Sequence, residues 1–442
     1  LNRLIHGEES SFSEQVGDLE VLLDVRYVIT LDADTLLPRE GARRLVATFA
    51  HPLNQAEFDP ESGRVVAGYT VLQPRVEIKP TSAEQSRFAQ IFSGDVGLDL
   101  YTHAVSDVYQ DLFGEGIYAG KGIYEVAAFE RSLEGRVPHN SLLSHDLFEG
   151  IHGRAGLVTD VALYEDYPAH YLVHTRRLHR WVRGDWQLLP WLLPSVPRAE
   201  GGKIPNTLSL VDRWKILDNL RRSLLGVALM ALLVAGWLWL PGSTLVWTLA
   251  GFLAVAVVVF SGLFSVFRQT FQGATLRDAV RSVWLATLRW LLALIFLPYE
   301  SLIAGDAIAS ALHRLLFSRK RLLQWKTSAH TLRLFGRRAR VRILWRQMGG
   351  VSLFAIALAW LIILFNPAAI FVAAPFLFAW VLSPYAAHWL SRPIVHERTA
   401  LSEEQSQELR SLARRMWLYF EQFVGPDDQW LPPDHFQEDP LG

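Results

Sequence analysis

Two aspartates follow a short apolar run near the start of the chain. Asp32 and Asp34 come directly after residues 26–31, whose β-branched and aromatic side chains are typical of a buried strand. Ligands of an open α/β sheet bind beyond the carboxyl ends of its strands. Two carboxylates at that edge can hold Mg²⁺ or Mn²⁺, which would also take phosphate oxygens. By itself Asp-x-Asp is more often a solvated turn, and the preceding strand is what favours a metal site.

A third carboxylate, Asp146, follows His145 and could act as a base. Asp146 and Glu149 also fit a helix capping box in which an acid replaces Ser or Thr. The two interpretations are compatible, because a helix N-terminus keeps a carboxylate ionised. An ionised carboxylate suits a general base that accepts a hydroxyl proton. In inverting glycosyl chemistry such a base activates the incoming oxygen on the face opposite the leaving group.

A glycine-rich stretch lies between these acids, at residues 114–122. It is not a phosphate loop, because Gly122 stands where that motif has Ser or Thr. Gly120, Lys121 and Gly122 instead favour a loop whose backbone can approach a sugar closely. A flexible turn between a helix and a strand explains the glycines about equally well.

Residues 176–186 combine guanidinium groups with indole rings. Arg177 and Arg180 suit diphosphate oxygens, which arginine binds in a bidentate manner. Trp181 offers a flat apolar face for a sugar ring. A basic helix that lies on anionic lipid would have the same composition. Two nearby histidines, His170 and His174, are expected to be structural, because no acid is spaced to complete a metal site.

Residues 1–205 have the pattern of a soluble α/β domain. A helix over residues 38–50, with Leu45, Val46 and Phe49 on one face, lies between the first strand and a second strand at 65–72, ended by Gln73-Pro74. Strand, helix and strand predict a crossover unit in a mostly parallel sheet.

A membrane region is predicted over residues 206–392. Two apolar stretches, 224–267 and 351–390, each have a central turn and the length of a transmembrane hairpin. Residues 280–303 are apolar but contain Arg281, Arg289, Pro298 and Glu300. If this segment crossed the membrane once, the basic residues at 213–222 and those at 314–346 would lie on opposite sides of the membrane. We therefore expect an interfacial or re-entrant segment at 280–303.

Composition narrows the function further. The 442 residues are half hydrophobic with a net charge of −1, so nothing global indicates a nucleic-acid partner. The absence of cysteine excludes disulfides and thiolate metal sites. Residues 393–442 are polar, with an amphipathic helix expected at 403–423, and we interpret the chain as an internal part of a longer protein.

Together these stretches resemble the cyclic β-1,2-glucan synthase family, in its glycosyltransferase family 84 domain and membrane region. The resemblance covers nearly the whole chain and depends on residues 27–35, 114–124, 144–146 and 179–187. It implies an α/β fold of the GT-A type, incomplete because the nucleoside-binding part would precede Leu1, followed by an α-helical transmembrane region. Residues 393–442 would begin a glucoamylase-like cyclising module, so the partners would include further modules of the same parent chain.

The resemblance also implies an inverting glucosyltransferase that elongates β-1,2-glucan from UDP-glucose. Asp32 and Asp34 would bind Mg²⁺ or Mn²⁺ and the diphosphate, and Asp146 would be the catalytic base. The substrate-binding residues would be Asp32, Gly120, Lys121, Gly122, His145, Arg177, Arg180 and Trp181. The protein would be a multi-pass protein of the bacterial inner membrane, in contact with lipid, with its catalytic domain in the cytoplasm.

Two other functions remain open at this point. One is a processive synthase of another β-glucan or polysaccharide. Arg177 and His145 argue against it, because cellulose- and hyaluronan-type synthases usually have Gln and Glu there. The other is a non-catalytic transport or scaffold protein, which would require ionisable residues inside the spans.

Overall fold

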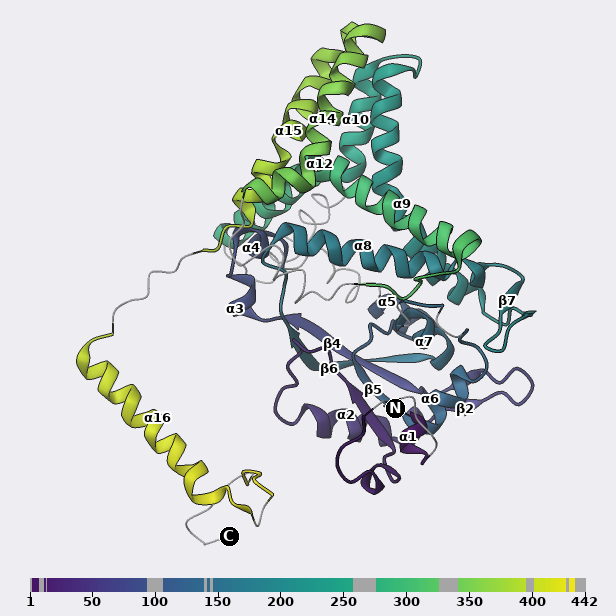
Figure 1. Ribbon diagram of the computed structural model, residues 1–442, viewed down its shortest axis with the longest axis vertical. Helices are drawn as coiled ribbons and strands as arrows, with labels where there is room; N and C mark the ends of the chain where they lie inside the picture. The colour runs from purple at the N-terminus through teal and green to yellow at the C-terminus, as the bar shows by residue number, and fades with distance from the viewer. Residues whose placement is uncertain are drawn as a thin grey trace. The chain divides into compact units, whose positions relative to one another are not determined.

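The computed structural model describes residues 2–7, 12, 14–93, 106–138, 141–143, 146–256, 276–325, 341–394, 401–426 and 429–433. The predicted site residue His145 lies outside these ranges. The chain divides into two compact units, Leu1–Ile394 and Val395–Gly442. In the first unit an α/β part carries helix α8, and a bundle of long helices rises on the other side of α8 (Figure 1).

Among the described residues, the main sheet of the α/β part has four strands. Their order is β1 (Tyr27–Thr30), β5 (Gly122–Glu125), β4 (Val71–Ile78) and β6 (Ala155–Glu165). β5 is antiparallel to both of its neighbours, whereas β4 and β6 are parallel. β1, β4 and β6 therefore run in one direction. Two of the three pairings are nevertheless antiparallel, so the sheet is mixed and not mostly parallel as predicted, and β5 separates the two strands of the predicted crossover.

The strand predicted at 65–72 is two strands, so that prediction was wrong in its bounds. β3 (Val65–Ala67) pairs with β2 (Glu57–Phe58) in a small separate sheet. Gly68 then turns the chain with a φ of +65°, and a Cβ there would lie 1.8 Å from the Gln55 carbonyl oxygen. β4 continues through Pro74 because the pairing with β6 is irregular directly after it, where a missing N–H does little harm.

Short helices surround the sheet. They are α1 (Asn2–Ile5), η1 (Glu20–Leu22), α2 (Gly41–Ala50), η2 (Pro52–Asn54), α3 (Pro80–Ala83), α4 (Arg87–Phe92), α5 (Ser106–Phe113), α6 (Val126–Leu133) and α7 (Asp146–Gly153). On α2, Leu45 and Phe49 are buried against Leu72 and Ile123. Val46, which was predicted on the same face, is exposed.

Helix α8 (Tyr171–Gln187) joins the α/β part to the bundle and packs along α12 (Leu276–His313). The Tyr171 hydroxyl donates to Glu300 at 3.2 Å, and its ring stacks on Phe296 with centroids 4.1 Å apart. His179 Nε2 lies 2.9 Å from Asp306. After α8 the chain forms η4 (Leu189–Leu192) and a hairpin of β7 (Ser195–Pro197) and β8 (Lys203–Pro205).

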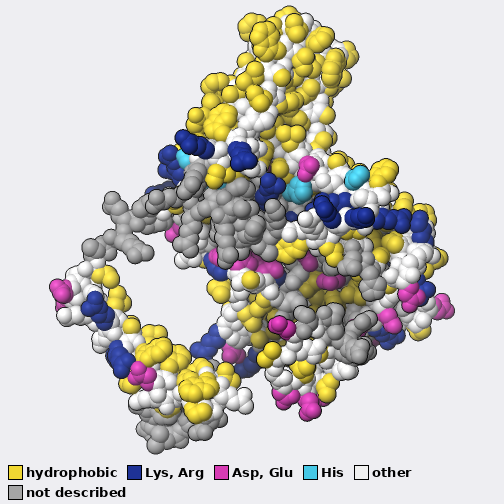
Figure 2. Space-filling model, in the orientation of Figure 1, with side chains coloured by type: hydrophobic (Ala, Val, Ile, Leu, Met, Phe, Trp, Pro, Cys, Tyr) yellow, Lys and Arg dark blue, Asp and Glu magenta, His cyan; other side chains and the backbone are white. Residues whose placement is uncertain are grey.

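The bundle consists of α9 (Leu210–Leu238), α10 (Thr244–Val255), α12, α14 (Val341–Phe365) and α15 (Ile370–Leu390), with short turns η5 (Arg314–Ser318) and η6 (Pro367–Ala369). In the described chain, four segments are long and apolar enough to cross a membrane: Leu210–Leu238, Val280–Ser318, Val341–Phe365 and Pro367–Leu390. Figure 2 shows hydrophobic side chains over the upright helices and a band of basic side chains near their base.

The predicted hairpins correspond to α9–α10 and α14–α15. α14 and α15 pack together and each is long enough to span, whereas α10 is short and residues 257–267 lie outside the described part. Pro375 and Pro384 lie within α15 without ending it.

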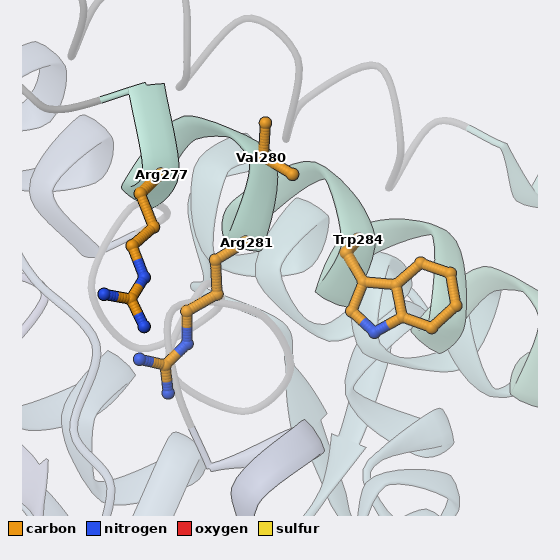
Figure 3. A pocket seen from close by; sticks show the side chains of 4 residues that line it. All are labelled: Arg277, Val280, Arg281 and Trp284. Atoms are coloured by element: carbon orange, nitrogen blue, oxygen red, sulfur yellow. The ribbon is translucent and has the colours of Figure 1, made fainter.

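Helix α12 is continuous from Leu276 to His313, with Pro298 inside it, so no re-entrant turn interrupts 280–303. Its position in the membrane stays a prediction. Near its start, a hollow of about 660 Å³ is lined by Arg277, Val280, Arg281 and Trp284. The two guanidinium groups extend from the same side of the helix (Figure 3). Basic and tryptophan side chains together are typical of a membrane interface.

The second unit contains α16 (Glu403–Phe423), with the bounds expected from the sequence. Ser402 and Gln405 form a capping box at its start. One side of the helix presents exposed apolar side chains, among them Leu409, Leu412, Met416, Trp417 and Phe420.

Asp212 links the α/β part to α9. Its carboxylate, 1% exposed, accepts from Arg64 at 2.6 Å and from the Ser209 backbone N–H at 3.0 Å. Asp212→Ala leaves a partly buried guanidinium without its partner, so we expect the unfolding midpoint to fall by on the order of 5 °C. Thermal unfolding of the detergent-solubilised protein measures the change. Glu200→Ala is the control, because its pair with Arg198 is exposed; an equal loss in both variants would contradict the assigned role.

Candidate active site

The turn after β1 carries Asp32 and Asp34 and is held against the end of β6. The Thr35 N–H donates to the Asp32 carbonyl at 3.0 Å, and Leu36 forms a β-bridge with Tyr164. Lys79 Nζ donates to the Asp34 carbonyl at 2.9 Å. Both aspartates are exposed at the carboxyl end of β1, where the sequence predicted them.

Lys121 joins this turn to the last residue of β6. Its Nζ lies 3.2 Å from Asp32 Oδ2 and 2.6 Å from Glu165 Oε1. Glu165 is buried and also accepts from the Thr35 hydroxyl at 3.0 Å. Lys121 was predicted to contact substrate; Glu165 was missed, because the strand over 155–165 was not recognised. That strand, which ends in an acid, was the available signal.

Gly120 brings the loop before β5 into contact with Asp146. Its φ is +81°, and a Cβ at this position would lie 2.8 Å from Asp146 Oδ1. Asp146 is the first residue of α7. At Gly122, a Cβ would lie 2.1 Å from the Leu72 carbonyl oxygen, so this glycine allows β5 to approach β4. Gly120 therefore contributes to the site, while Gly122 serves the sheet.

Arg177, Arg180 and Trp181 lie on α8. The Arg177 guanidinium stacks on the Trp181 ring at 4.5 Å and lies 3.9 Å from Glu165. Its Nε is buried without a hydrogen-bond partner among the described residues. One face of Trp181 is thus already covered by arginine, and a sugar would use the rest of the ring.

Arg180 lies within the electrostatic reach of both predicted acidic positions. Burial and the charge of Arg177 lower the pKa of Arg180, while Asp32 and Asp146 both act to raise it. The interaction between two charges weakens with distance and with screening by water, so partly buried neighbours contribute most. Asp32, Asp146 and Arg180 therefore share one electrostatic environment.

A segment after α12 also reaches α8. Arg180 stacks on the Trp325 ring at 4.9 Å. Arg183 donates to the Gln324 carbonyl, and Gln187 Nε2 donates to the Leu322 carbonyl at 3.1 Å. Trp325 was not predicted, because nothing in its neighbouring sequence marks a site.

Two further carboxyls have pKa values displaced by their surroundings. Burial, with a smaller effect of Asp146, raises the pKa of Glu149 to about 7. Burial also raises the pKa of Asp185 to about 7, although Asn219 donates a hydrogen bond to it at 3.0 Å. Both carboxyls lie near Asp146, whose charge disfavours a second negative charge beside it. His170 and His174 are buried, as expected of structural residues.

The donor set suits a divalent ion only in part. Two exposed aspartates supply the hard oxygen ligands that Mg²⁺ and Mn²⁺ prefer. Within the described ranges, no group of three or more His, Cys, Asp or Glu side chains could hold a metal. The residues thus fit an ion that Asp32 and Asp34 would share with ligand oxygens and water, and do not form a complete protein cage.

The chain was also compared with known proteins. No known family model matches the chain. The chain is 38% identical over 447 aligned residues to cyclic beta-(1,2)-glucan synthase NdvB of Rhizobium meliloti (strain 1021), a match that covers all of this chain. It is homologous to part of a cyclic β-1,2-glucan synthase. The chain spans 15% of the length of NdvB.

The raised pKa of Glu149 should make the stability of the protein depend on pH. A carboxyl whose pKa is raised on folding binds its proton more tightly in the folded state, so its contribution is lost as pH rises from about 4.5 to about 7. Glu149→Gln removes this loss, and we expect the variant to gain ~3 kcal/mol over the wild type at pH 8 relative to pH 4.5.

Unfolding midpoints at the two pH values measure the difference. Glu134→Gln, at an exposed position after α6, should show the same pH dependence as the wild type. A difference between Glu149→Gln and wild type that does not change with pH would contradict the assignment.

Proposed function

We propose that the chain is the catalytic and membrane part of an inverting glucosyltransferase, which elongates β-1,2-glucan from UDP-glucose during cyclic β-1,2-glucan synthesis. The single observation that supports this most is that two neighbouring residues link the acids: Gly120 lies against Asp146, and Lys121 pairs with Asp32 at 3.2 Å. The homology to NdvB over the whole chain supports the choice of product.

Each group has a proposed role. Asp146 accepts the proton of the acceptor hydroxyl, since it is a carboxylate at a helix start beside the glycine loop. Lys121, Arg177 and Arg180 bind the diphosphate of the donor, and Trp181 contacts sugar. A divalent ion held by Asp32 and Asp34 would neutralise charge on the departing diphosphate. His145 remains a proposed substrate contact outside the described residues.

The fold class and domain limits are part of the proposal. A GT-A-type domain would occupy residues 1–205, a membrane region 206–392 and the start of a cyclising module 393–442. A sheet with acids at its carboxyl edge and a basic helix across it supports the first assignment. The basic side chains near the base of the bundle support a cytoplasmic catalytic domain in the inner membrane (Figure 2).

A transport or scaffold function finds less support. α12 is a candidate span that contains ionisable residues, as such a function would require. Among them, Arg289 donates to the Ile91 carbonyl of α4. Glu300, however, accepts a hydrogen bond from Tyr171 at the start of α8. This contact assigns Glu300 to packing between α12 and the helix that carries the arginines. A synthase of a different polysaccharide would use the same site, and the identity to NdvB favours β-1,2-glucan.

Transfer activity tests the proposed base. Asp146→Asn removes the proton acceptor while keeping its shape, so incorporation of labelled glucose from UDP-glucose into β-1,2-glucan should fall by at least about a hundredfold. The assay uses the full-length protein in membranes. Asp160→Asn, at an exposed position on β6, should retain wild-type activity. Normal incorporation by Asp146→Asn would remove Asp146 from the mechanism.

Gly120→Ala tests the contact between the loop and the base. The new Cβ would displace the Asp146 carboxylate, so we expect kcat to fall by about tenfold or more while the protein stays folded. Gly135→Ala is the matched control: its φ is +67°, and a Cβ there meets nothing within 4 Å. Equal kcat values for the two variants would show that left-handed backbone strain, and not the contact with Asp146, determines the effect.

A further inference from the structure

Glu165, the last residue of β6, contacts side chains from three other segments. Glu165 accepts hydrogen bonds from Lys121 at 2.6 Å and Thr35 at 3.0 Å, and lies 3.9 Å from Arg177. The three partners come from the loop before β5, the turn after β1 and α8. Glu165 is therefore where three separate segments of the site meet.

The two cations at Glu165 differ in what else they contact. Lys121 Nζ also lies 3.2 Å from Asp32, whose side chain is 60% exposed. Arg177 stacks on Trp181 and keeps a buried Nε without a partner among the described residues. A buried N–H without an acceptor is costly, so a ligand oxygen at this position would satisfy it.

We propose, on the basis of the function proposed above, that Glu165 is a positioning residue: its buried carboxylate holds Lys121 and Arg177 in place to receive the diphosphate of the sugar donor. Neither cation is well solvated, and each would repel the other without the carboxylate between them. Glu165 touches neither the donor nor the reacting atoms.

Asp32 alone would not hold Lys121 in place. Asp32 is exposed and is a proposed ligand of the divalent ion, so its pairing with Lys121 weakens when the ion binds. Glu165 is buried, and its backbone is fixed because its carbonyl accepts from the Lys79 N–H at 2.9 Å. It keeps Lys121 directed at the site whichever partner Asp32 has.

Glu165→Gln is the direct test, because glutamine keeps the shape and can accept from Thr35, but loses the charge. In the full-length protein in membranes, we expect the KM for UDP-glucose and the inhibition constant of UDP to rise roughly ten- to a hundredfold. The matched control is Thr35→Val, which removes the other hydrogen bond to the same carboxylate. Its two constants should stay within about twofold of wild type.

A double-mutant cycle separates positioning from general stabilisation. If Glu165 acts through Lys121 and Arg177, then adding Glu165→Gln to a variant that already carries Lys121→Met and Arg177→Met should weaken UDP binding little further. Independent, multiplied effects, or a Glu165→Gln variant with wild-type constants, would overturn the proposal. A structural role alone would lower the amount of folded protein and leave both constants unchanged.

Glu165→Asp provides a second variant if the glutamine variant does not fold. It keeps the charge on a shorter side chain, so its constants should lie between those of wild type and Lys121→Met; constants equal to wild type would contradict positioning. Absence of UDP-glucose turnover by the wild-type protein would refute the proposed function itself. Turnover by the wild type with unchanged constants in the Glu165 variants would refute only the role of Glu165.

Discussion

The packing of α8 against α12 determines where the arginines of the site lie. Tyr171 and His179 contact Glu300 and Asp306 of α12. On the same helix, Arg177 lies beside Glu165, and Arg180 lies within the electrostatic reach of Asp32 and Asp146. Because one helix makes both sets of contacts, a shift of α12 would carry the arginines with it. The membrane region is thereby part of the geometry of the site.

The charges of the site are arranged to be balanced before any ligand arrives. Lys121, Arg177 and Arg180 lie among Asp32, Asp146 and Glu165. Buried charges of one sign alone would repel one another, whereas neighbouring charges of opposite sign attract. The balance is uneven in exposure, since Asp32 is open to solvent and Glu165 is not. A cation can therefore reach Asp32 from solvent without breaking the pair between Lys121 and Glu165.

The sequence predicted the outer parts of this arrangement better than the inner ones. Asp32 was assigned to a strand end from the apolar run before it, and Asp146 to a helix start from its acidic spacing. Both predictions depend on patterns among residues that are close in the sequence, and such patterns can be recognised without a structure. Glu165 and Trp325 have no such pattern, because their partners lie on other elements. The break of residues 65–72 into two strands was likewise missed, because it depends on a close approach of Gly68 to Gln55.

The first turns of α9 belong to the interior of the α/β part. Ile216 and Leu220 pack in the same apolar cluster as Phe148 and Trp191, and Lys215 is buried with its ammonium 3.1 Å from Glu115. A polypeptide shortened to end at residue 205 would lose these side chains and leave the cluster open to water. A fragment that contains only the α/β part should therefore retain α9 through Leu220, where the helix still packs in this cluster.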